Sequence, residues 1–92
     1  MREAKDMEQH NITWRGIALE ITFTPEKFGL VDHIEIMSEG RAPLPVTETG
    51  YRSHFIPAGT VAAHDGATAF VTAWLEHEAV RTGWSGAQLS LF

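Results

Sequence analysis

The stretch that decides the fold reads Gly16-Ile17-Ala18-Leu19-Glu20-Ile21-Thr22-Phe23-Thr24. Large apolar residues occupy every second position, and smaller or polar residues stand between them. This period-two alternation is typical of a β-strand with one buried face. The segment 31–38 repeats the pattern: its isoleucines share one face, and the opposite face carries His33, Glu35 and Met37. Pro25 and Gly29 indicate a connection between these two predicted strands.

A third predicted strand begins after Gly50 and ends at Pro57. Its alternation places on one face Tyr51, Ser53 and Phe55, and on the other Arg52, His54 and Ile56. A fourth short strand is expected at 60–63.

The segment 66–81 predicts an amphipathic helix. Its apolar residues recur at spacings of three and four, as they do on one face of an α-helix. Asp65 is the expected N-cap, and Gly83 is the expected stop.

These elements together predict an α+β fold, in which a small antiparallel sheet of three to four strands carries one C-terminal amphipathic helix on its apolar face. The expected domain limits are a polar leader over 1–11, a single globular domain over 12–83 and a flexible tail over 84–92. The residues expected to be most buried are Ile17, Leu19, Ile21, Ile34, Ile36, Phe55, Phe70 and Trp74.

Composition narrows the function classes. The chain of 92 residues has 43% hydrophobic residues, a net charge of -5 and no cysteine. An acidic chain is unsuited to binding nucleic-acid backbones directly, and the absence of cysteine excludes disulfides and thiolate zinc sites. No secretory signal and no membrane-spanning stretch is present, which predicts a cytoplasmic protein. No phosphate loop occurs among the glycines, and no cofactor is expected.

The last five residues carry the strongest functional signal: Gln88-Leu89-Ser90-Leu91-Phe92. This pentapeptide resembles the short peptide by which bacterial DNA polymerases, mismatch-repair proteins and replication regulators dock on the DNA sliding clamp. The resemblance implies that Leu91 and Phe92 fill an apolar pocket of the clamp and that Gln88 makes polar contacts. Leu89 and Ser90 then set the spacing. In a linear motif of this kind, the two apolar anchors supply most of the affinity, and the polar contact adds selectivity.

A second resemblance concerns the segment 42–55, which is similar to a segment of small proteins encoded on alphaproteobacterial plasmids and genomes. No activity follows from it. The leading hypothesis is a small non-catalytic bacterial interaction module, associated with replication, repair or a mobile element, that the tail recruits to the sliding clamp. Whether the tail is free or packs on the core as an edge strand stays open, as does the oligomeric state.

Two other functions remain as alternatives. Five histidines are present, and His33, His54 and His77 could supply a metal site if the fold brings them together. Alternatively, a mobile-element protein could inhibit a host factor through its acidic surface. A recognition loop is a further hypothesis for the region after Pro45, and its residues are Glu48, Tyr51 and Arg52.

Ser53 is a candidate nucleophile. The adjacent His54 points to the opposite face of the predicted strand, so a Ser53 nucleophile needs another base. His33 or His77 could reach it in space. No Gly-x-Ser-x-Gly turn surrounds this serine, and a hydrolase is therefore not the expected function.

Overall fold

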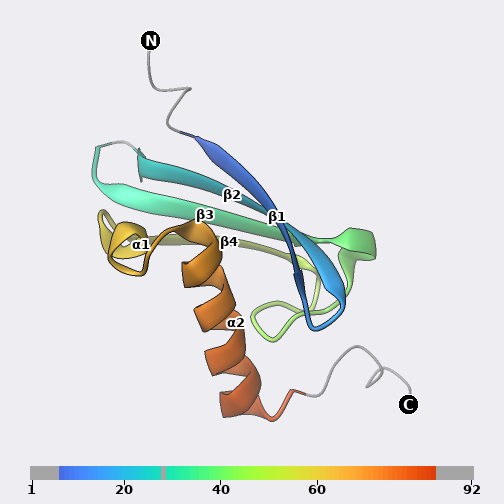
Figure 1. Ribbon diagram of the computed structural model, residues 1–92. Helices are drawn as coiled ribbons and strands as arrows, with labels where there is room; N and C mark the ends of the chain where they lie inside the picture. The colour runs from blue at the N-terminus through green and yellow to red at the C-terminus, as the bar shows by residue number, and fades with distance from the viewer. Residues whose placement is uncertain (1–6, 28, 85–92) are drawn as a thin grey trace.

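A single sheet with helices on one side of it makes up the computed structural model, which describes residues 7–27 and 29–84 (Figure 1). The bounds of the elements are β1 Glu8–Trp14, β2 Ile17–Lys27, β3 Val31–Ser38, the 3-10 turn η2 Glu39–Arg41, β4 Tyr51–Pro57, α1 Thr60–Ala63 and α2 Ala67–Thr82. The predicted α+β fold, a small antiparallel sheet followed by a C-terminal helix, is confirmed. Within the described residues, neither helix is long and apolar enough to cross a membrane.

Each strand pairs with the next one along the chain, in the antiparallel order β1-β2-β3-β4. Ile21 lies opposite Ile36, and Phe23 lies opposite Ile34, so the apolar residues of β2 and β3 share one face. Side chains alternate along a strand, so these apolar residues all point to the same side of the sheet. On that side they pack against α2. The buried core consists of Trp14, Leu19, Ile21, Phe23, Ile34, Ile36, Leu44, Val46, Val61, Ala67, Val71, Leu75 and Ala79.

The predicted core is confirmed at Leu19 and at the isoleucines 21, 34 and 36. Ile17, Phe70 and Trp74 are only partly buried and pack against its margin. The prediction for Phe55 is wrong, because its side chain is 52% exposed. Phe55 lies on the face of β4 that points away from α2. The apolar character of a residue does not by itself show which face of an edge strand the helix covers.

Strand β1 is not among the strands that the sequence predicts. Residues 8–11 form its first half, whereas the sequence pattern assigns them to a polar leader. Glu8 lies opposite Phe23, and the pairing continues without interruption to Trp14 opposite Ile17. The two-residue turn Arg15-Gly16 has positive φ at both positions, 49° and 85°, as tight hairpin turns require. Backbone hydrogen bonds hold the polar half of β1, and such bonds leave no hydrophobic pattern in the sequence.

Pro25 does not end the second strand. Strand β2 continues to Lys27, and the register shifts between Thr24 and Lys27. Glu26 adopts a positive φ of 50° there. A proline is tolerated at such a bulge because the irregular ladder does not need its missing N–H.

Asp32 ties this bulge to the first helix. Its carboxylate is buried, with 2% of the residue exposed. One oxygen, Oδ1, accepts the backbone N–H of Glu26 at 3.1 Å. The other oxygen, Oδ2, accepts the N–H groups of Gly59 at 3.1 Å and Val61 at 3.3 Å. The carboxylate therefore joins β2, β3 and the start of α1 at one buried point.

The expected fourth strand at 60–63 is wrong, because these residues form α1. Gly59 has a φ of 92°, which turns the chain out of β4. The Asp32 carboxylate then satisfies N–H groups that a helix start leaves without intrahelical partners. A cap supplied from 27 positions away in the sequence is invisible to a local pattern.

The long helix α2 agrees with its predicted range to within one residue at each end. Gly83 ends it in a left-handed conformation with a φ of 71°, as expected. The predicted N-cap is wrong. Gly66 takes that position, and Asp65 precedes it with a φ of 72°.

Gly50 stands where the chain passes close to itself before β4. A Cβ atom at Gly50 would lie 2.5 Å from the carbonyl carbon of Arg41 and 2.6 Å from Oγ of Ser38. Ser38 is buried, and its hydroxyl donates to the carbonyl of Ala42 at 2.6 Å. The Ser38 N–H donates to the Gly50 carbonyl at 2.8 Å. This close approach closes the loop between η2 and β4.

Replacing Asp32 should destabilise the domain strongly. Each buried donor left without a partner costs about 1–3 kcal/mol, so Asp32→Ala should lower the free energy of unfolding by about 3 kcal/mol or more. Asp32→Asn keeps one acceptor oxygen and should cost less. Urea unfolding followed by circular dichroism measures both. The exposed Glu20→Ala should stay within about 0.5 kcal/mol of wild type, and a comparable loss in both alanine variants would contradict the role of Asp32.

Gly50→Ala should cost more than Gly16→Ala. Both glycines have positive φ, 80° and 85°, but a Cβ at Gly16 meets nothing within 4 Å. Gly16→Ala should therefore show only the conformational cost, about 1–2 kcal/mol. Gly50→Ala adds steric overlap with backbone and should cost several kcal/mol. Equal losses in thermal or urea unfolding would show that the close approach does not matter.

Candidate functional site

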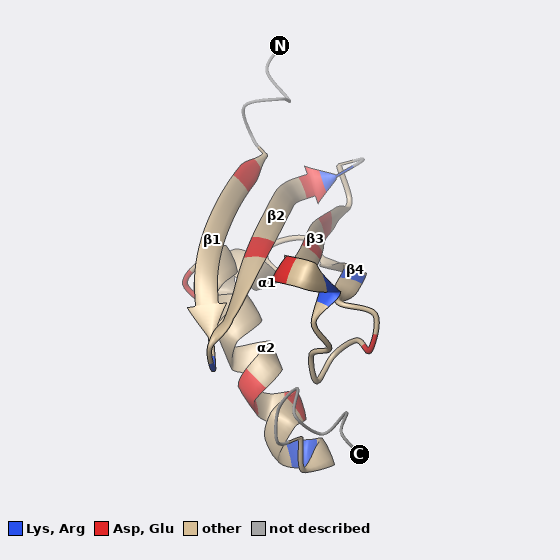
Figure 2. Ribbon diagram, turned by 90° about the vertical axis from the view of Figure 1, so that its right-hand side faces the viewer, with Lys and Arg blue, Asp and Glu red and all other residues tan. Residues whose placement is uncertain are grey.

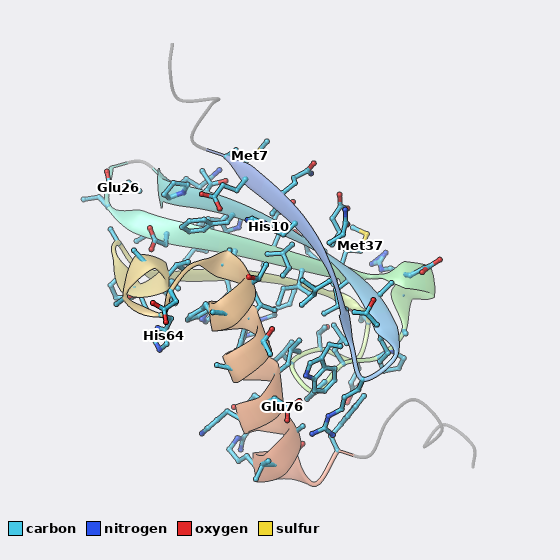
Figure 3. All side chains as sticks on the ribbon, viewed as in Figure 1. Met7, His10, Glu26, Met37, His64 and Glu76 are labelled. Atoms are coloured by element: carbon cyan, nitrogen blue, oxygen red, sulfur yellow. The ribbon has the colours of Figure 1, made fainter. Side chains whose placement is uncertain are left out.

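The face of the sheet that points away from α2 is called the open face. Figure 2 views the sheet from this side, with the strands side by side and α2 behind them. Met37 projects from it, away from the helix (Figure 3), and 42% of this residue is exposed. The strand residues that share the open face are Gln9, Asn11, Thr13, Ala18, Glu20, Thr22, Thr24, His33, Glu35, Met37, Tyr51, Ser53 and Phe55.

His33 and Ser53 meet on the open face. Nε2 of His33 lies 2.7 Å from Oγ of Ser53. The His33 ring also stacks on Phe55, with 4.3 Å between ring centroids and 18° between planes. Burial lowers the pKa of His33, the charge of Lys27 lowers it further, and Glu35 acts in the opposite direction. The imidazole is therefore neutral near pH 7 and can accept the Ser53 proton.

Tyr51 and Glu35 form a second pair beside the first. The Tyr51 hydroxyl donates to Oε2 of Glu35 at 2.7 Å. This hydrogen bond raises the pKa of Tyr51, with smaller contributions from burial and from the Glu35 charge, while a hydrogen bond with Ser53 lowers it. The four side chains of His33, Ser53, Tyr51 and Glu35 are called the polar quartet. They form two hydrogen-bonded pairs, His33 with Ser53 and Tyr51 with Glu35, side by side across β3 and β4.

The predicted recognition loop of Glu48, Tyr51 and Arg52 is divided by the fold. Tyr51 belongs to the open face, whereas Arg52 lies on the helix side of β4. The Arg52 Nη1 donates to the carbonyl of Val46 at 2.9 Å, and its guanidinium carbon lies 5.6 Å from the centroid of the Trp74 ring. Glu48 is exposed in the preceding loop. These residues do not form one surface.

The three predicted metal ligands are also separated. His33 is on the open face, whereas the His54 ring packs on Trp74 of α2 with centroids 4.5 Å apart. His77 is exposed on α2, with Nδ1 3.6 Å from Glu78. Over residues 7–27 and 29–84, no group of three or more His, Asp or Glu side chains is placed to hold a metal ion. The histidines named in the sequence therefore do not form one site.

A shallow hollow of about 330 Å³ lies beside His54. Burial lowers the pKa of His54, and the nearby Arg52 charge lowers it further. Arg81 donates to Glu78 at 2.6 Å at the same hollow. The residues that line it are Pro45, Val46, Arg52, His54, Trp74, Glu78 and Arg81. Its cations already have protein acceptors, so the hollow offers no free anion-binding group.

The pentapeptide 88–92 lies outside the described residues, and Trp84 is the last described residue before it. Trp84 packs on Trp14, with ring centroids 5.1 Å apart. The Trp14 indole donates to Glu76 at 2.7 Å, and Arg15 donates to the same carboxylate at 2.8 Å. Figure 3 shows Glu76 on α2. The four residues Trp14, Arg15, Glu76 and Trp84 are called the tail root.

Sequence patterns reveal only part of these sites. They offer two candidate histidines for Ser53, and in the structure His33 is the one within hydrogen-bond distance. They show Glu35 only as a neighbour of His33, because its bond to Tyr51 depends on cross-strand register. That register follows once 31–38 and 51–57 are paired. Glu76 carried no signal in the sequence, because its partners are 61 and 62 positions away.

One family model matches the chain. It is the model described as KlcB third domain, and it covers residues 7–84. No curated protein and no solved structure gives a match.

The two lowered histidine pKa values predict that acid destabilises the domain. In the unfolded chain both histidines titrate near 6.5, the ordinary value, whereas in the folded chain they bind protons only at lower pH. The unfolded state thus binds more protons below about pH 6.5, and the free energy of unfolding falls as the pH falls through that window. Urea unfolding at pH 7.5, 6.5 and 5.5 should show this decrease. His54→Gln should flatten it, and an unchanged slope in that variant would contradict the assignment.

Proposed function

We propose that this chain, which belongs to the KlcB third domain family, serves as an interaction module and docks on the bacterial DNA sliding clamp through residues 88–92. The observation that carries the proposal is the pentapeptide Gln88-Leu89-Ser90-Leu91-Phe92. The family description names a domain among others in a protein called KlcB. A domain of this kind can add a binding function to a larger system without an activity of its own.

The tail root supports this proposal. The helix that leads to the pentapeptide ends at Gly83, and Trp84 is held against Trp14. Three residues, 85–87, separate Trp84 from Gln88. Four extended residue steps reach at most about 14 Å, so a clamp bound to the pentapeptide would sit close to the tail root.

Charge supports indirect contact with DNA. The chain carries a net charge of -5, and four of its cations donate to acceptors inside the domain. These cations are Arg15, Arg41, Arg52 and Arg81. Binding to DNA phosphates would have to compete with those contacts, whereas a clamp already encircling DNA would bring the module to its site without any phosphate contact from these arginines.

The energetics fit a linear motif. Burying Leu91 and Phe92 is worth roughly 1.5–3 kcal/mol for each side chain. Backbone hydrogen bonds and Gln88 add to this, and ordering a short peptide subtracts from it. A micromolar affinity, about -8 kcal/mol, is the expected result.

Titration calorimetry of a bacterial sliding clamp with this protein tests the proposal. Wild type should bind with micromolar affinity, and removal of Phe92 should weaken binding at least about tenfold. The double variant Leu91→Ala with Phe92→Ala should give no heat of binding. Ser90→Ala is the matched control, since Ser90 sets spacing only, and it should bind nearly as wild type does.

Thermal melts of the same variants separate docking from packing. If the pentapeptide serves the clamp, the double variant should melt within about 4 °C of wild type, because surface changes rarely exceed about 0.5 kcal/mol. Absence of binding by wild type would falsify the proposal. A melting temperature lowered by many degrees would instead show that Leu91 and Phe92 belong to the core.

A further inference from the structure

We propose that Ser53 is a nucleophile that accepts an acyl group from an activated ester, with His33 as its general base. This inference concerns the open face and is independent of the pentapeptide. The chemical class of the reactant is a small ester with a good leaving group.

The geometry of the pair carries the proposal. The Ser53 side chain lies on the exposed surface of β4, and its Oγ is 2.7 Å from Nε2 of His33. Nucleophile and base are thus within direct hydrogen-bond distance, the first requirement for an activated serine. His33 itself is only 7% exposed. Ser53 is thus an exposed residue, whereas its base is largely shielded from solvent.

Phe55 fixes the orientation of the base. The two rings are stacked with 18° between their planes, so the imidazole cannot swing away from Ser53 without losing this contact. In Ser-His-Asp triads a carboxylate orients the histidine. Here an aromatic face does so, and Phe55 acts as a positioning residue.

Burial favours the reactive, neutral form of His33, although the Glu35 charge acts in the opposite direction. The charged groups that act on it are Glu35 on its own strand and Lys27 at the end of β2, and its neighbours on β4 are the uncharged Ser53 and Phe55. Because burial depresses its pKa, the ring is unprotonated near pH 7 and ready to take a proton. Reactivity should therefore rise with pH and level off near neutrality.

The step balances as follows. Oγ of Ser53 attacks the ester carbonyl carbon and forms a new C–O bond while its proton passes to Nε2 of His33. The bond between the carbonyl carbon and the leaving oxygen breaks, and the leaving group takes the proton from His33. The products are acyl-Ser53 and an alcohol or phenol, and no oxidant or metal is required.

Intact-mass spectrometry after incubation with p-nitrophenyl acetate tests the proposal, and peptide mapping locates the adduct. Wild type should gain one acetyl group on Ser53, and Ser53→Ala should gain none there. His33→Gln should slow the reaction at least about a hundredfold. Thr22→Ala is the matched control, because it removes a hydroxyl from the same face without touching the pair, and it should react as wild type does.

The pH profile keeps the test independent of whether His33→Gln folds. The acetylation rate of wild type should rise with a midpoint below 6.5, the ordinary histidine value. Acetylation confined to Lys27 or the N-terminal amine, or a rate that ignores pH across this range, would overturn the proposal. Ser53→Ala should still bind the sliding clamp, so failure here leaves the docking proposal standing.

Discussion

The carboxylate of Asp32 is the constraint on which the rest of the arrangement depends. It joins the bulge of β2 to the start of α1 inside the molecule, where an unpartnered charge would be costly. By binding the N–H groups of Gly59 and Val61, it fixes where the chain leaves the edge strand β4 and turns beneath the sheet. That turn sets the starting point of α2, and hence which of its residues meet the sheet. Val61, Val71 and Leu75 become fully buried as a result.

The fixed register of β3 and β4 gives the two faces of these strands different roles. Residues of one parity, such as Ile34 and Ile36, fill the core under α2, and those of the other parity build the polar quartet. A shift of one residue would exchange the two sets and bury a hydroxyl and a carboxylate against the helix. The same core packing that stabilises the domain therefore keeps Ser53 and His33 together on the open face.

Sequence patterns predict what depends on local periodicity. The strands at 17–24 and 31–38 and the helix α2 follow from the alternation of apolar residues. The polar half of β1, the helix α1 and the position of Phe55 do not, because they depend on pairing partners and on a distant carboxylate. In the candidate sites, too, some features follow from local periodicity and others depend on the pairing of distant residues. The separate faces of Tyr51 and Arg52 follow from strand alternation, whereas the bond from Tyr51 to Glu35 needs the paired sheet.

The tail root and the polar quartet lie on different parts of the fold, and this bears on how the two proposed activities relate. Trp14 faces the core at the end of β1, whereas Ser53 faces outward from β4, at the opposite edge of the sheet. No residue is shared between the two groups, and the sheet between them is held by continuous pairing. Sites without common contacts contribute nearly additive free energies. A protein held at residues 88–92 thus leaves the open face available to a second molecule, which is the property that an interaction module requires.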